Sequence, residues 1–138
     1  MKPALRTLVL LCVGSIAGYA FGADDPIAKY LPLNAAPVHH RVVAENDLVR
    51  VLDVRIPPGD TVPAHQHDLP SVFITISPAD LVFRNLAGET VRNAYRDREL
   101  PSEPHIELRG PAPAPRVVSN IDTVELRALR IELKQPAA

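Results

Sequence analysis

Short runs of β-branched and other apolar residues, separated by prolines and glycines, follow one another from residue 38 to residue 133. The clearest run is SVFITIS at residues 71–77. Alternate residues of a strand face opposite sides of a sheet, so the regular alternation in this run predicts a strand. Val72, Ile74 and Ile76 share one face, which we expect to lie in the core or opposite the face that carries the functional side chains.

The remaining runs predict an all-β domain. The ranges expected as strands are 39–43, 48–56, 80–86, 90–95, 106–108, 116–120 and 124–133. Gly88 lies between two of these ranges and predicts a hairpin turn. No window shows a helical period longer than one or two turns, and the prolines of residues 23–37 favour an arm rather than a helix. Many short strands with proline-rich turns predict one sandwich or small barrel over residues 38–134, followed by a tail at 135–138.

The first 22 residues predict an export signal. Lys2 and Arg6 form a short basic region, an apolar stretch of residues 8–20 follows, and small residues stand at Ala20 and Gly22. This order is typical of a secretory signal peptide, although a retained membrane anchor is the alternative. We therefore expect a mature chain that begins at Ala23, with Ala20 as the alternative last residue of the peptide, in the periplasm or outside the cell.

Charge and cysteine content limit the partners of the mature chain. Fifteen basic residues less Lys2 and Arg6 leave 13 against 16 acidic residues, a net charge of −3. This balance argues against nucleic acid and against an anionic membrane as partners. Cys12 is the single cysteine and leaves with the signal peptide, so the mature chain has no disulfide.

An H-x-H pair is the strongest functional signal. Gly59 stands six positions before His65, and His67 follows two positions later. In an extended chain, residues i and i+2 face the same side, so the two imidazoles can converge on one point. Two imidazoles at one point make up half of a divalent-metal site.

This chain resembles the cupin superfamily, whose first motif is a glycine, five residues, H-x-H, a glutamate and a second glycine. The glutamate position falls on Ser71 or Val72. The second motif, aligned on Asn120, places Arg116 where cupins carry a third metal-binding histidine. The resemblance covers residues 38–134 and implies a small jelly-roll β-barrel with its binding site in the barrel mouth.

The departures from these motifs leave three interpretations of the site. A metal held by His65 and His67 would be bound weakly, because Arg116 repels a cation; His105 is a further candidate ligand. A donor-rich mouth would instead suit a small anion, which a guanidinium can hold bidentately. In the third interpretation, backbone carbonyl groups satisfy the two histidines, and Arg116 extends outward or pairs with Asp68 or another acidic residue. The candidate ligand-binding residues are His65, His67, Ser71, Phe73, Thr75 and Arg116.

These interpretations give three functional hypotheses and no catalytic residue. The first is an exported barrel that binds a small polar, anionic ligand, and the second is a metal-dependent oxygenase, isomerase or lyase. The third is a barrel with a structural or interaction role. His39 and His40 are adjacent, so their rings are expected on opposite sides, with His40 at the surface. We also expect a homodimer, since cupin-like barrels commonly pair through an edge strand.

Overall fold

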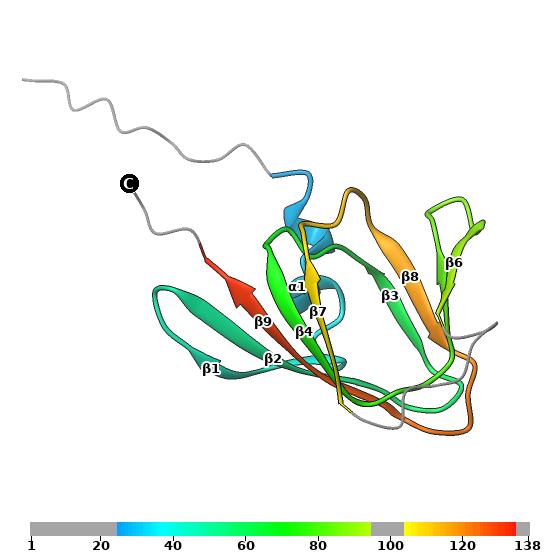
Figure 1. Ribbon diagram of the computed structural model, residues 1–138. Coiled ribbons are helices and arrows are strands. Elements are labelled where there is room, and N and C mark those ends of the chain that lie inside the picture. The colour runs from blue at the N-terminus through cyan, green and yellow to red at the C-terminus, as the bar shows by residue number, and fades with distance from the viewer. Residues whose placement is uncertain (1–24, 95–103, 135–138) are drawn as a thin grey trace, which may run out of the picture.

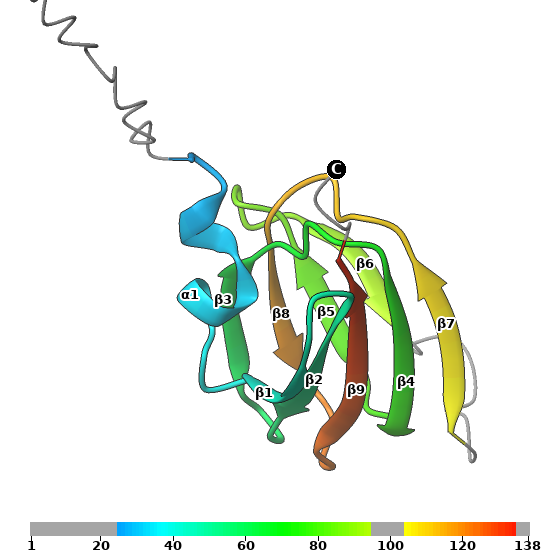
Figure 2. The ribbon, with the colours of Figure 1, turned by 90° about the vertical axis from the view of Figure 1, so that its left-hand side faces the viewer.

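The computed structural model describes residues 25–94 and 104–134, which form two antiparallel β-sheets (Figure 1). The predicted signal peptide and the tail at 135–138 lie outside the described residues. The five-stranded sheet has the order β1-β2-β9-β4-β7, and the four-stranded sheet has the order β3-β8-β5-β6. The strands are β1 (His40–Glu45), β2 (Val49–Ile56), β3 (Thr61–His65), β4 (Ser71–Ser77), β5 (Leu81–Arg84), β6 (Thr90–Ala94), β7 (His105–Arg109), β8 (Arg116–Asn120) and β9 (Leu126–Leu133). Figure 2 shows the five-stranded sheet in front of the four-stranded one, which confirms the predicted all-β, two-sheet architecture.

The alternation in β4 is confirmed, but its inner face is the one that carries two hydroxyl side chains and a phenylalanine. Ser71, Phe73 and Thr75 are buried between the sheets, whereas Val72 and Ile74 are half-buried and Ile76 is 40% exposed on the outside. The expectation that the aliphatic set fills the core is therefore wrong, and its alternative, the face away from the histidines, is correct. Phe73 and Thr75 of this face border the functional site.

The predicted hairpin and the predicted C-terminal strand are both present. Gly88 has φ +83° in the turn between β5 and β6, a conformation that glycine adopts without strain. β9 lies between β2 and β4 at the centre of the five-stranded sheet. Asn120 ends β8, and its side-chain amide donates to the carbonyl groups of Ile56 and Val124, which ties three strand ends together.

The segment before β1 differs from the expected arm. Ala28–Tyr30 form a 3₁₀ turn, η1, and Pro32–Ala35 form a single turn of α-helix, α1. Pro32 stands at the first helical position, where its missing N–H costs nothing, so a proline-rich segment can begin a helix there. Among the described residues, no helix has the length and apolar character needed to span a membrane.

The core formed by the described residues consists of two clusters of buried side chains. The larger cluster joins the four-stranded sheet to the end of β2 and to the segment before β1; its members are Ala36, Ile56, Val62, Ala79, Leu81, Ala94, Val118 and Leu126. The smaller cluster holds Leu52, Val54, Phe73 and Ala128, with Leu33 of α1 packed against it. The two sheets and α1 therefore enclose one interior, and the functional side chains face into it.

The outer face of the five-stranded sheet is the surface on which we expect the predicted homodimer to form. Val72 and Ile74 of β4 pair with Leu108 and Ile106 of the edge strand β7, and Leu108 is 85% exposed. An aliphatic patch beside an unpaired strand edge is typical of a contact between copies. We expect light scattering at micromolar concentration to give a dimer mass, and Leu108→Glu to shift it toward the monomer.

Leu86 is the matched control for this dimer, since it is 58% exposed in the hairpin of the other sheet. We expect Leu86→Glu to leave the mass unchanged. A monomer mass for the unmodified protein would contradict the predicted homodimer.

Candidate functional site

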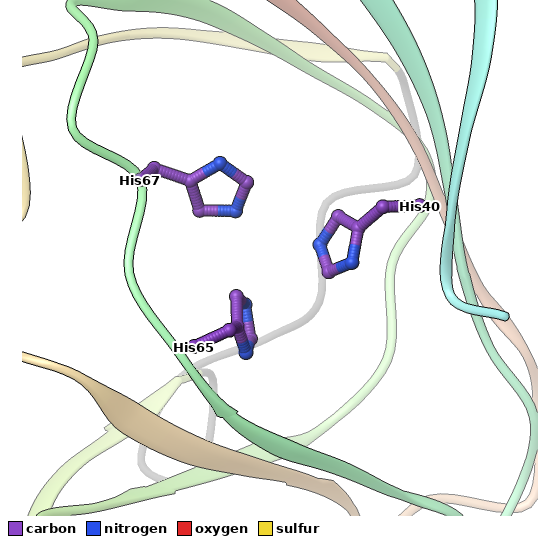
Figure 3. Close-up of side chains that lie close together, drawn as sticks. All are labelled: His40, His65 and His67. Atoms are coloured by element: carbon purple, nitrogen blue, oxygen red, sulfur yellow. The ribbon is translucent and has the colours of Figure 1, made fainter. Parts of the chain in front are cut away.

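Three histidines from two separate parts of the chain meet between the sheets. His65 ends β3, His67 follows two residues later, and His40 begins β1. One ligand atom from each ring lies within 4.8 Å of the others, and the ring centroids are 4.8–5.3 Å apart. Figure 3 shows the three rings around one common space, with His40 facing the other two. The H-x-H pair therefore converges as its spacing predicted, and a third imidazole joins it.

Each of the three rings has its Nδ1 atom next to a hydrogen-bond acceptor. His40 Nδ1 lies 3.1 Å from the Ala36 carbonyl oxygen, and His65 Nδ1 lies 2.9 Å from that of Pro63. His67 Nδ1 lies 2.9 Å from a carboxylate oxygen of Glu132. Oxygen acceptors of this kind require Nδ1 to carry the proton, which leaves the lone pair on Nε2 of every ring.

Burial keeps these imidazoles uncharged. Burial, together with the neighbouring His65 and His67, lowers the pKa of His40 from 6.5 to about 3. Burial and the charge of Arg130 lower the pKa of His67 to about 2, and burial also lowers the pKa of His65. At neutral pH all three rings are neutral, which is the form that binds a metal ion.

This donor set fits a divalent metal ion. Three neutral imidazoles with free Nε2 atoms are the protein ligands of many zinc sites, and imidazole also suits iron, nickel and copper. Glu132 is 2% exposed, and its carboxylate orients His67 from behind, as carboxylates do for metal-binding histidines. The three histidines thus form a group that can hold a metal, with coordination positions left for another molecule.

The depressed pKa values of the histidines predict a marked pH dependence of folding in the metal-free protein. The unfolded chain takes up protons on these histidines as the pH falls below 6.5, whereas folded His40 and His67 resist protonation down to about pH 3 and about pH 2. Their contribution is therefore complete above pH 6.5 and is lost progressively below it. Between pH 7 and pH 5 we expect a loss of about 2 kcal/mol in unfolding free energy for each of these two histidines, measured by urea denaturation. His40→Phe should reduce the slope, and an unchanged slope would contradict this origin.

Two cavities adjoin the histidines. The inner one, about 90 Å³, is lined by all three histidines together with Phe73 and Thr75. The outer one, about 270 Å³, shares His65 and His67 with it and opens past Arg116 and the loop of residues 110–114.

The structure brings together most of the side chains that the sequence proposed as ligand-binding. Phe73 and Thr75 line the inner cavity. Arg116 lies across from His65 in the pairing of β8 with β3, at the rim of the outer cavity. Ser71 is 2% exposed, but it does not line either cavity, and its hydroxyl has no hydrogen-bond partner among the described residues. Ligand binding by these residues stays a prediction.

Two predictions about the other histidines are corrected. His40 was expected at the surface, yet it is 3% exposed and is the third member of the group. The adjacent His39 does face the opposite way, where its Nε2 lies 3.0 Å from Asp60. His105, the further candidate ligand, lies outside the group, with its side chain 47% exposed beside Glu107. Spacing alone could not bring β1 against β3, because that contact depends on the closure of the barrel.

Sequence reasoning also missed the charged residues on the inner face of β9. Arg130 and Glu132 alternate with Leu129 and Ile131 and are 5% and 2% exposed. The spacing could have indicated this, because Ala128, Arg130 and Glu132 are two residues apart and therefore face the same side of the strand, the side on which Ala128 is buried. Charged residues seldom occupy interior positions unless they are paired or functional.

Comparison with known proteins supports the fold. No protein-family model and no curated protein matches this chain. Among solved structures it is similar to a cupin domain from Bordetella pertussis Tohama I, with 23% identity, a TM-score of 0.52, and coverage of 70% of this chain and 92% of the other. It is also similar to an RmlC-like cupin family protein with a double-stranded β-helix fold from Methanocaldococcus jannaschii (13% identity, TM-score 0.47, coverage of 70% and 80%).

The observed architecture agrees with the similarity to the Bordetella pertussis cupin domain. Two antiparallel sheets enclose the H-x-H pair, as in the jelly-roll barrel that the sequence resemblance implied. The resemblance to the cupin superfamily is thereby confirmed at the level of the fold: this chain has a two-sheet jelly-roll fold like that of the cupin domain, with three histidines gathered inside it.

Proposed function

We propose that this protein binds a divalent metal ion through His40, His65 and His67, and that it holds a small anionic molecule above that ion. The observation that carries the proposal is the hydrogen bonding of the three rings. Every Nδ1 faces an oxygen acceptor, so every Nε2 offers its lone pair to one common space. Three neutral nitrogen donors of this kind leave at least one coordination position for an exogenous molecule.

The charge at the mouth supports an anionic ligand. Four arginines, among them Arg116 and Arg130, line the outer cavity. The single carboxylate among its described lining residues is that of Glu107. Guanidinium groups bind carboxylates and phosphates through paired hydrogen bonds, so the lining suits either group.

Metal titration tests the first part of the proposal. The protein is purified, stripped with a chelator and titrated with zinc, manganese and nickel by calorimetry. We expect one ion per chain, with zinc or nickel bound more tightly than manganese, because nitrogen donors favour the later metals. Failure to bind any of these ions below roughly millimolar concentration would overturn the metal centre.

A metal-dependent reaction at the same site is the second candidate function. The coordination positions left open by three histidines favour it, since catalytic metal sites keep such positions for water or substrate. An oxygenase, isomerase or lyase would each use the ion in this way. The cupin fold itself does not choose among them, because one fold hosts many activities.

We also propose that the chain acts after export. The basic and apolar segments of residues 1–22 support this. Expression of the full chain in a bacterium followed by fractionation should place the protein in the periplasm or medium. Mass spectrometry should then give the mass of a chain that begins at Ala23. A full-length chain that begins at Met1 in the cytoplasmic fraction would contradict export.

A further inference from the structure

The barrel interior contains a buried arginine that has no hydrogen-bonded partner for its charge among the described residues. Arg130 is 5% exposed and lines both cavities beside His65 and His67. Its Nε atom is fully buried and donates no hydrogen bond to any described residue. Among the described residues, the nearest carboxylate is that of Glu132, whose oxygen lies 3.9 Å from Arg130 Nε and already accepts from His67.

A guanidinium in this position is costly unless an anion joins it. Burial lowers the pKa of Arg130 to about 10, so the side chain still carries its charge at neutral pH. A buried charge without a hydrogen-bonded partner is strongly unfavourable, and a buried donor without an acceptor adds to that cost. Because Arg130 lines both cavities, an anion bound there would supply the counter-charge that this guanidinium lacks at close range.

A second guanidinium is held in place nearby. Arg109 stacks on the ring of Phe73, with its central carbon 3.5 Å from the ring centroid. Its Nε and Nη2 atoms donate to Glu107 at 2.8 and 2.6 Å. These contacts fix the plane of the guanidinium and leave Nη1 for another acceptor, so Arg109 is preorganised for an anion.

The net positive charge of the residues that line the outer cavity favours a ligand with more than one negative charge. Its described lining holds Arg92, Arg109, Arg116 and Arg130 against the single carboxylate of Glu107. The histidines are neutral, so three positive charges remain without a counter-charge in that lining. One carboxylate would neutralise only one of them.

We propose that this cavity binds a small molecule with two negative charges on oxygen, such as a dicarboxylate or a phosphate monoester, and that Arg130 is its buried anchor. Arg109 and Arg116 contact the same molecule from the rim. The inference rests on the proposed function for the position of the ligand, and it adds the charge of that ligand and the residue that selects it.

Anion titration of metal-free protein tests the charge rule separately from the metal. Malonate and inorganic phosphate serve as dianion probes, and acetate serves as the monoanion, at pH 7.5 and low salt. We expect at least one dianion to bind about 10-fold or more tightly than acetate, because each added charge-assisted contact contributes about that factor. Preference for malonate indicates a dicarboxylate, and preference for phosphate indicates a phosphate monoester. Equal affinity for all three probes would overturn the proposal.

Three arginine variants identify the anchor. Arg130→Gln should weaken dianion binding about 10- to 100-fold, and Arg109→Gln should weaken it as well. Arg41→Gln is the matched control, because Arg41 is 73% exposed in its side chain and pairs with Asp53 away from the cavity. Unchanged dianion affinity in Arg109→Gln and in a folded Arg130→Gln would refute the site. If Arg130→Gln fails to fold, Arg109→Gln decides the outcome. Because these titrations use metal-free protein, an absence of metal binding would leave their outcome intact.

Discussion

Replacement of His40 by alanine is expected to weaken zinc binding more than about 100-fold. Loss of a residue that only supports a metal ligand typically costs 10- to 100-fold in affinity, and His40 supplies a ligand itself. It is also the member of the group that comes from β1, so its loss leaves only the H-x-H pair. Calorimetric titration of the stripped variant measures the effect.

His105→Ala is the control for this experiment. It removes the same side chain from an exposed position on β7, outside the group of three, and should change zinc affinity less than about 2-fold. Equal losses in the two variants, or no loss in His40→Ala, would show that the three rings do not hold the ion together.

Replacement of Phe73 by alanine is expected to lower the unfolding free energy by about 3–5 kcal/mol. Phe73 is 7% exposed in the smaller core cluster with Leu52 and Val54, and its ring carries the guanidinium of Arg109. The change removes buried apolar surface, leaves a void beside the inner cavity and ends the stacking contact. Urea denaturation of the metal-free protein at pH 7.5 gives the value.

Leu86→Ala provides the comparison, since Leu86 is 58% exposed in a hairpin turn. It should change the unfolding free energy by no more than about 0.5 kcal/mol. A Phe73→Ala protein as stable as this control would mean that the inner face of β4 is open to water.

The fold could be predicted in outline because its determinants are local. The alternation in SVFITIS predicted β4, and Gly88 predicted the turn between β5 and β6. The turn after Asn120 predicted the start of β9 to within two residues. The segment before β1 was predicted less well. Its prolines argued against a helix, but Pro32 begins one, since its effect depends on whether it stands at the first turn or inside.

The site could be predicted only in part, because its members are far apart in the chain. His65 and His67 share a face through their spacing of two, which the sequence shows directly. His40 joins them only because β1 and β3, in different sheets, are brought face to face when the barrel closes. The strand pattern likewise did not reveal which face of β4 is the inner one, because both faces carry residues that can be buried.

The sequence by itself determined an all-β chain with paired imidazoles at one point, since both properties follow from residue spacing along a strand. Only the tertiary structure decided that His40 is the third histidine of the group and that the guanidinium of Arg130 is buried beside it. His40 stands beside Arg41 in a polar stretch, and Arg130 lies in a strand that also reads as helical by propensity. Their burial depends on which strands face each other across the barrel. That arrangement depends on long-range pairing, which the spacing of residues within one strand does not specify.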